Sequence, residues 1–341
     1  SAISRPSLTT LLCFTIYLMK LLLSVLTGLS ALTLITATSI DHDEITERPV
    51  IGIVTRINDD NTEEYIAASY VKWLESLGAR SIPVPLLASN ETVIDIFNHV
   101  NGFLWPGGGD VETHVTDGVF KMWELVLEAN QNGDHFPLWG TCLGLEIMCG
   151  LVSDVGMDII KPGFDVENIS LPLLLTDKAE SSVMFNDPRI KSIVQTEAVT
   201  MNNHHLGIPP LSFSNDASLS STFKILSTSK DRGNAAFVSS VEHYEYPIFG
   251  VQWHPEKNNF EFGTVDVDGT DRPYWNINHS SDAIQVSLEM ARVFVDEARR
   301  NAHSYRNGKD YRSVWEYEMV NGAQFEQRFI IRRLGDDVVE E

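Results

Sequence analysis

A cysteine lies at the centre of the first stretch that could do chemistry, residues 139–144, with the sequence WGTCLG. An apolar run leads into Gly140 and an amphipathic run follows Leu143, which predicts a strand, a sharp turn and a helix. Glycines on both sides of Cys142 allow a strained turn that lifts the thiol above the sheet, as in a nucleophile elbow. The N-terminus of the helix favours a thiolate. We therefore expect Cys142 to be a nucleophile; the alternative is a small buried apolar residue, as most cysteines are.

A histidine that could serve as the base lies far downstream, where the apolar run over residues 246–253 ends in His254-Pro255-Glu256. An imidazole is suited to remove a thiol proton near neutral pH, and a neighbouring carboxylate can orient the ring. Catalytic residues usually meet through the fold rather than along the sequence. We expect His254 to be the general base and Glu256 to orient it. The alternative is that His254 caps a strand and Glu256 is a solvated charge.

Three glycines at residues 107–109 follow another apolar run, residues 100–105. Glycines at a strand end leave backbone N–H groups free to face an oxyanion, and acyl transfer needs such donors. Gly107 and Gly108, together with the N–H of Leu143, are therefore the predicted oxyanion donors. Such a stretch could also be a plain flexible turn. Taken together, the three motifs predict an acyl-transfer site.

Apolar strands that alternate with amphipathic helices must position these motifs. The pattern predicts a mostly parallel sheet with helices on both faces, an α/β fold, and reactive residues beyond the carboxyl ends of its strands. The expected strands cover residues 49–55, 81–87, 102–105 and 136–139, and the expected helices cover residues 63–77, 90–97, 115–130 and 281–301. Residues 223–227, 235–241 and 247–253 predict a partly antiparallel region, residues 258–280 a polar loop, and residues 325–331 an added strand.

The motifs WPGGG at residues 105–109, WGTCLG at residues 139–144 and GVQWHPE at residues 250–256 resemble the class I glutamine amidotransferase-like hydrolases. Within that group, residues 65–75 and 201–206 are most similar to the gamma-glutamyl hydrolases, and the resemblance runs from about Arg48 to about Arg333. It implies a flavodoxin-like α/β domain with extra antiparallel strands. It also implies a cysteine peptidase of the omega type that cleaves folylpoly-gamma-glutamates through a Cys–His acyl-enzyme, as a homodimer. No metal or organic cofactor is implied.

Two adjacent histidines, His204 and His205, lie among short apolar pieces and polar breaks. No second ligand pair occurs at zinc spacing, so we predict no metal site. The resemblance implies that His204 binds the substrate near its glutamyl group; otherwise both are surface-loop histidines. Arg56 and Lys257 lie near the motifs and are candidates to receive the alpha-carboxylates of the substrate.

The N-terminal region predicts a secretory signal peptide over residues 1–39. Met19 and Lys20 precede an apolar run over residues 21–35, and small residues follow up to Ser39, after which cleavage is expected. Residues 1–18 would then be translated sequence upstream of the start. A transmembrane anchor is the alternative, because about 20 apolar residues span a bilayer; Lys20 interrupts the run. We expect a linker over residues 40–47, one domain over residues 48–334 and an acidic tail over residues 335–341.

The net charge of −22 argues against a nucleic-acid partner, and 43% hydrophobic residues suffice for a sizeable core. Secretion predicts the extracellular space or a lysosomal or vacuolar lumen, with no membrane partner once the signal peptide is removed. Glycosylation sequons begin at Asn90, Asn168 and Asn278. On one helix, Cys142 and Cys149 would lie about 10 Å apart, beyond the roughly 7 Å that a disulfide spans. We expect no disulfide between them and a buried Cys149.

Three other functions share parts of this pattern. A glutamine amidotransferase would use the same cysteine and histidine but would deliver ammonia to a synthetase. A hydrolase of other small gamma-glutamyl amides would differ in its pocket residues. A catalytically inactive secreted folate-binding homologue would retain the pocket without the chemistry.

Overall fold

The computed structural model of the 341-residue chain describes residues 46–58, 60–109, 111–305, 311–322 and 325–334. The predicted signal peptide, the acidic tail and residues 40–45 of the predicted linker lie outside the described residues. Within the described ranges, no helix combines the length and apolar character needed to cross a membrane.

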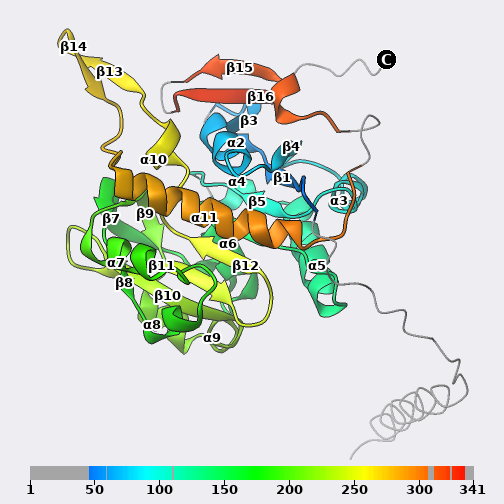
Figure 1. The fold of residues 1–341 in the computed structure, drawn as a ribbon, viewed down its shortest axis with the longest axis horizontal. Coiled ribbons are helices and arrows are strands. Elements are labelled where there is room, and N and C mark those ends of the chain that lie inside the picture. The colour runs from blue at the N-terminus through cyan, green and yellow to red at the C-terminus, as the bar shows by residue number, and fades with distance from the viewer. Residues whose placement is uncertain (1–45, 59, 110, 306–310, 323–324, 335–341) are drawn as a thin grey trace, which may run out of the picture. The chain divides into compact units, whose positions relative to one another are not determined.

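An eight-stranded sheet lies at the centre of the fold, in the order β4-β1-β5-β6-β12-β11-β10-β8 (Figure 1). Neighbouring strands are parallel from β4 to β12 and antiparallel from β12 to β8. The predicted mostly parallel sheet with added antiparallel strands is therefore confirmed. Its strands are β1 (Val50–Val54), β4 (Arg80–Val84), β5 (Phe103–Trp105), β6 (Leu138–Thr141), β8 (Leu174–Leu175), β10 (Phe223–Lys230), β11 (Ala236–His243) and β12 (Ile248–Val251).

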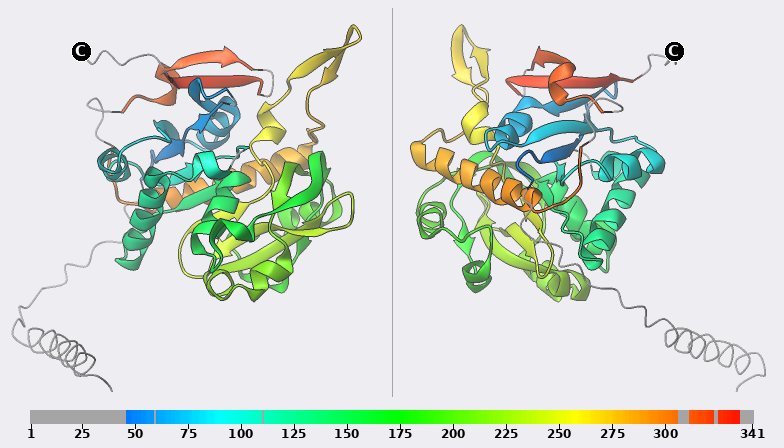
Figure 2. Two further views of the ribbon diagram at one scale, coloured as in Figure 1. Left: turned by 180° about the vertical axis from the view of Figure 1, so that it is seen from behind. Right: turned by 45° about the vertical axis from the view of Figure 1, so that its right-hand side comes forward.

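Helices cover both faces of this sheet, so its inner strands are buried on both sides. In β1, Ile51 and Ile53 face one hydrophobic core and Val50 and Val54 face the other. The first core contains α2 (Ala68–Glu75), α7 (Pro188–Thr196) and α11 (Ser281–Arg299). The second contains α3 (Asn90–Phe97), α5 (Asp117–Gln131) and α6 (Leu143–Val152). The orange ribbon of α11 and the green ribbon of α5 can be followed in Figure 2.

The predicted helix over residues 63–77 is wrong in its first part. Residues Glu63–Ala67 form β3, which precedes α2 and belongs to a four-stranded sheet in the order β15-β16-β3-β2. The partner strands are β2 (Arg56–Ile57), β15 (Glu318–Asn321) and β16 (Gln327–Arg333). Hydrogen bonds to β16 hold this segment extended, and β16 lies near the other end of the chain. The added strand predicted over residues 325–331 corresponds to β16.

The predicted polar loop over residues 258–280 is also wrong in part. It contains most of α10 (Lys257–Phe260) and a hairpin of β13 (Thr264–Val267) and β14 (Thr270–Pro273), which extends away from the central sheet in Figure 1. Asp268 and Gly269 form its turn with positive φ angles of 54° and 74°. An Asp-Gly pair between two strands is a strong hairpin signal, so the sequence carried this information.

The two histidines of residues 202–205 lie on a strand rather than in a loop. This strand, β9 (Thr200–Gly207), pairs antiparallel with β7 (Lys161–Leu171) in a separate two-stranded sheet. The remaining elements are α4 (Val111–His114), α8 (Pro210–Asn215), α9 (Ala217–Thr222) and the 3-10 helices η1 (Gly156–Ile159), η2 (Asp177–Ser181) and η3 (Val314–Glu316).

Candidate active site

Cys142 occupies a sharp turn between β6 and α6. Its φ of 52° lies in the left-handed region, and its N–H donates to the carbonyl of Val251 in β12 at 2.7 Å. A Cβ on Gly140 would lie 2.7 Å from the carbonyl carbon of Gly144, and a Cβ on Gly144 would lie 2.1 Å from the carbonyl oxygen of Trp105. Both positions therefore exclude any side chain, because the strand, the turn and the helix approach so closely.

The thiol of Cys142 is buried rather than solvated, with 4% of the residue exposed. Burial raises the pKa of the Cys142 thiol, and the nearby carboxylate of Glu146 raises it further. The N–H of Leu143 at the start of α6 acts in the opposite direction but has a smaller effect. The N–H of Leu143 thus favours the thiolate, as predicted, but burial and Glu146 outweigh it, so the pKa of the thiol is raised overall in the unliganded site.

Gln252 links the thiol to a buried carboxyl group. Its Nε2 donates to Glu146 Oε1 at 2.8 Å and lies 3.7 Å from the Sγ of Cys142. Burial raises the pKa of Glu146 to about 7, although this hydrogen bond favours the charged form. A carboxyl group with a pKa near neutral pH is therefore linked to the sulfur through Gln252.

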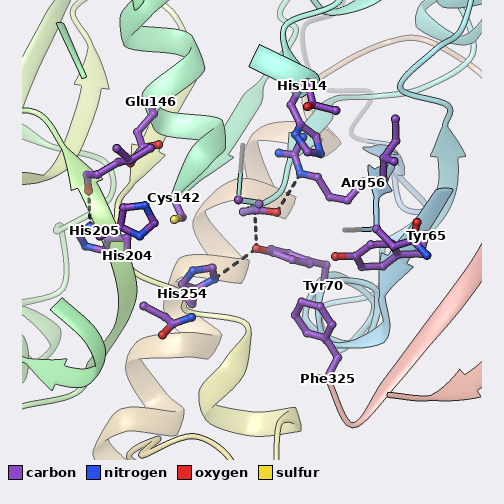
Figure 3. Close-up of a pocket in the computed structure, with 18 of the residues that line it drawn as sticks. Arg56, Tyr65, Tyr70, His114, Cys142, Glu146, His204, His205, His254 and Phe325 are labelled. Carbon is purple, nitrogen blue, oxygen red and sulfur yellow. Dashed lines mark hydrogen bonds between the residues drawn. The ribbon is translucent and has the colours of Figure 1, made fainter. Parts of the chain in front are cut away.

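His254 and Glu256 are joined by a hydrogen bond of 2.8 Å between Nδ1 and Oε1. Both residues are buried, so Glu256 is not a solvated charge. Because Nδ1 is engaged, Nε2 is the ring nitrogen left to accept a proton. A Cβ on Gly107 would lie 2.6 Å from His254 Cε1 and 3.3 Å from Cys142 Cβ, so both side chains pack around this glycine. Cys142 and His254 face the same space in Figure 3.

The glycine loop after β5 is held by two side chains. The N–H of Gly107 donates to Tyr70 Oη at 2.8 Å. Arg56 donates from Nε to the carbonyl of Gly107 at 2.9 Å and from Nη2 to the carbonyl of Pro106. Within the described ranges, the N–H of Gly108 has no acceptor. Of the two glycines expected to supply an oxyanion donor, Gly108 therefore has the available N–H, whereas that of Gly107 is bound to Tyr70.

A cavity of about 470 Å³ brings most of the predicted site residues together. Cys142, His254, Gly107, Gly108 and His204 line it, and Glu256 contacts His254 from outside the lining. Other side chains in its wall are Arg56, Tyr65, Tyr70, Glu146, Glu167, His205, Lys257, Trp275 and Phe325. The wall thus carries both charged and aromatic groups.

His204 is buried on β9, which rules out the interpretation as a surface-loop residue. Its Nδ1 donates to the carbonyl of Leu206 at 2.6 Å, and its ring meets Phe237 edge-on at a centroid distance of 5.0 Å. Burial lowers the pKa of His204 to about 3, so the ring is neutral at physiological pH. His205, in contrast, is exposed at the rim.

Three side chains of the site were missed by sequence reasoning. Tyr70 falls within the predicted helix over residues 63–77, and Gln252 falls within the predicted apolar run over residues 246–253. Glu146 had a detectable signal, since it is the single charged residue of α6. A charge in a helix that is otherwise apolar and buried usually has a specific partner.

The described ranges contain no group of three or more histidine, cysteine, aspartate or glutamate residues placed to hold a metal ion. Cys142 and Cys149 are both free and buried. The prediction that they form no disulfide with each other is confirmed, and so is the buried position of Cys149, which has no exposed surface.

The chain is similar to characterised proteins over most of its length. The profile of the peptidase C26 family matches residues 49–256. Gamma-glutamyl hydrolase B of Dictyostelium discoideum is 38% identical, over 77% of this chain and 76% of that protein. The gamma-glutamyl hydrolases of Mus musculus and Homo sapiens are 35% and 32% identical, each over 85% of this chain and over 89% and 91% of those proteins. Because the profile and these relatives each span more than half of the sequence, the protein belongs to the peptidase C26 family and, within it, to the gamma-glutamyl hydrolases.

Proposed function

We propose that the protein hydrolyses the gamma-glutamyl bonds of folylpoly-gamma-glutamates through an acyl-enzyme formed on Cys142. The observation that carries this proposal is the meeting of Cys142 and the His254–Glu256 pair at one cavity that also contains two cationic side chains, Arg56 and Lys257. A protein with a net charge of −22 needs such local positive charge to accept a polyanion. The names of the relatives support the same bond class.

The first half of the reaction forms the acyl-enzyme. Because burial keeps the thiol of Cys142 protonated, His254 Nε2 removes its proton as the sulfur attacks the gamma-carbonyl carbon. A C–S bond forms, and the carbonyl π electrons move to the oxygen. The N–H groups of Leu143 and Gly108 stabilise this oxyanion. When the intermediate collapses, the C–N bond breaks and His254 gives its proton to the leaving amine.

The second half releases the product. His254 Nε2 takes a proton from water, whose oxygen attacks the thioester carbon. The C–S bond then breaks, and the sulfur regains a proton from the imidazolium. Glu256 accepts the Nδ1–H of His254 in both halves and stabilises each imidazolium. The neutral His204 offers its ring edge to the glutamyl group without adding charge.

We also infer that residues 1–39 are a signal peptide, that residues 48–334 form one domain, and that the mature protein is a homodimer of a secretory compartment. Asn90 is the favoured glycosylation site because it is exposed at the start of α3. Asn168 and Asn278 are only partly exposed, and the amide nitrogen of Asn278 donates to the carbonyl of Ala198 at 2.8 Å. N-terminal sequencing, glycosidase treatment and light scattering of secreted protein would test these inferences.

Product analysis with a folate pentaglutamate tests the function. The purified protein should shorten the substrate and release glutamate or a gamma-linked peptide, whereas Cys142→Ala should bind the substrate without cleaving it. If the unaltered protein bound the substrate but left it intact, the inactive folate-binding homologue would be the better interpretation. If the protein cleaved other small gamma-glutamyl amides but not folate polyglutamates, the hydrolase of small gamma-glutamyl amides would be the better interpretation. Glutamine hydrolysis with ammonia transfer to an added synthetase would indicate an amidotransferase.

A further inference from the structure

Arg56 is a buried cation in the wall of the cavity. The residue is 4% exposed, and within the described ranges no carboxylate lies at ion-pair distance from its guanidinium. Burial lowers the pKa of Arg56 to about 10, so the group stays charged at physiological pH. A buried charge without a counter-ion costs several kcal/mol. Such a group therefore points to an anion that arrives from outside the protein.

The contacts of Arg56 leave part of its guanidinium free. An arginine side chain has five N–H donors, and Arg56 uses one on the carbonyl of Gly107 and one on the carbonyl of Pro106. The remaining donors include both N–H groups of Nη1, for which the described residues supply no acceptor. Because Arg56 also lines the cavity, these donors are available to a ligand there.

The same contacts connect Arg56 to the glycine loop after β5, which carries the proposed oxyanion donor Gly108. In a trans peptide, the carbonyl and the N–H point in opposite directions. By holding the carbonyls of Pro106 and Gly107, Arg56 turns the N–H groups of Gly107 and Gly108 away from itself. One of them reaches Tyr70, and the other is the proposed oxyanion donor. Figure 3 shows Arg56 on the side of Tyr65 and Tyr70, across the cavity from His204 and His205.

We propose that Arg56 binds the alpha-carboxylate of the glutamyl residue whose gamma-carbonyl is attacked, which makes it a specificity-determining residue. The inference rests on the proposed function. The glutamyl residue that carries the attacked gamma-carbonyl is favoured over the leaving glutamate. The reason is that Arg56 is hydrogen-bonded to the loop whose N–H group would bind the oxygen of that carbonyl. A planar guanidinium also matches a carboxylate in a bidentate contact.

Lys257 is the other cation of the cavity, and its surroundings suit a different role. Its Nζ lies 5.1 Å from the ring centroid of Trp275 and 5.0 Å from that of Phe325. Two aromatic rings already stabilise this charge. Arg56 is therefore the better partner for a carboxylate next to the scissile bond.

A binding comparison in the inactive Cys142→Ala protein tests this subsite. The ligands are folate diglutamate and its analogue with a carboxamide in place of the inner alpha-carboxylate. With Arg56 present, calorimetry should give about 10- to 100-fold weaker binding for the carboxamide, as expected for loss of a charge-assisted hydrogen-bonded pair. With Arg56→Gln added, the two ligands should bind within about threefold of each other. Arg56→Lys, a second variant that keeps the charge, should give an intermediate ratio.

The ratio of the two affinities separates a carboxylate contact from general damage to the loop. A merely structural role of Arg56 would weaken the binding of both ligands equally. Arg189→Gln is the matched control, since Arg189 lies on α7 with a side chain that is 65% exposed. It should leave the ratio unchanged. If the Arg56→Gln variant still bound the diglutamate tightly and still discriminated against the carboxamide analogue, the proposed subsite alone would be overturned. Failure of Cys142→Ala to bind either ligand, with no cleavage by the unaltered protein, would overturn the proposed function as well.

Discussion

His254 and Glu256, which follow the end of strand β12 within a few residues, form a buried hydrogen bond of 2.8 Å. The two side chains are 9% and 1% exposed, so water does not compete for this contact. The bond keeps a proton on Nδ1 and leaves Nε2 to accept one from a thiol. It also places a carboxylate where an imidazolium would form during the proposed reaction. The contact thus supports the orienting role that the sequence led us to expect for Glu256.

Replacing Glu256 by glutamine tests this role. The amide has nearly the same size and can still hold the ring, but it cannot stabilise an imidazolium and it permits the wrong tautomer. We expect kcat to fall by about 10²- to 10⁴-fold with little change in KM. Initial rates on a folate polyglutamate would measure this, with the thermal unfolding midpoint as the control for folding. A kcat within about twofold of the unaltered enzyme would contradict the role.

Gly144→Ala tests the close approach that forms the elbow. The added Cβ would lie 2.1 Å from the carbonyl oxygen of Trp105, a backbone atom that cannot move without shifting β5. We expect the free energy of unfolding to fall by about 3 kcal/mol and the activity to be lost. Gly263→Ala is the matched control, since a Cβ there has no neighbour within 4 Å; its stability should change by less than about 0.5 kcal/mol in urea unfolding. Equal stabilities of the two variants would show that the contact tolerates a side chain.

The elbow and the central strands could be predicted because their information is local. Gly140 and Gly144 mark the turn around Cys142, and the apolar run of β1 is long enough to indicate burial on both faces. The strand β3 could not be predicted, because hydrogen bonds to β16 hold it extended. The residues of β3 directly precede those of α2, and the helical spacing of apolar residues in α2 dominates the hydrophobic pattern of the combined segment.

The candidate site likewise combines residues that local sequence identifies with residues that only the fold reveals. Cys142 and His254 lie in short motifs whose residue types made them candidates, and the fold brings them to one cavity. Tyr70 fits the apolar face of a helix equally well, and only the fold reveals that its hydroxyl accepts the N–H of Gly107. The net direction in which the pKa of the thiol is shifted could not be predicted for a related reason. A helix terminus is visible in sequence, whereas the burial that outweighs it depends on the whole fold.

Glu146→Gln should change the pH dependence of stability. The folded-state pKa of Glu146 is raised from its ordinary value to about 7 by burial. The folded protein therefore loses stability as the pH rises from about 4.5 to 7, by about 3 kcal/mol in total. The variant has no carboxyl to ionise and should lack this loss. Urea unfolding at pH 5 and pH 8 measures the difference, and an unchanged pH dependence in the variant would contradict the raised pKa.

The same variant should also make Cys142 more reactive. The charge of Glu146 is one of the causes that raise the pKa of the thiol, so its removal lowers that pKa. Alkylation by iodoacetamide should therefore reach a given rate at lower pH than in the unaltered protein. The rate measured in Cys142→Ala accounts for the other cysteines. If the curves with and without Glu146 coincided, the carboxylate would have no influence on the sulfur.

His204→Phe should have the opposite effect on the pH dependence of stability. The folded-state pKa of His204 is lowered to about 3 by burial, so an unfolded chain binds a proton here below about pH 6.5 that the folded chain does not. The stability that His204 contributes is present above pH 6.5 and is lost as the pH falls, by about 2 kcal/mol between pH 6.5 and 5. Phenylalanine cannot take up that proton, so the variant should lose less stability on acidification, although it also lacks the hydrogen bond to Leu206.

Urea unfolding at pH 7.5 and pH 5 measures this change, and His205→Phe, at the exposed neighbouring position, should keep the acid sensitivity of the unaltered protein. If His204→Phe kept it as well, the ring would be protonated in the folded state, where it could donate from both nitrogens to Leu206 and Asn202.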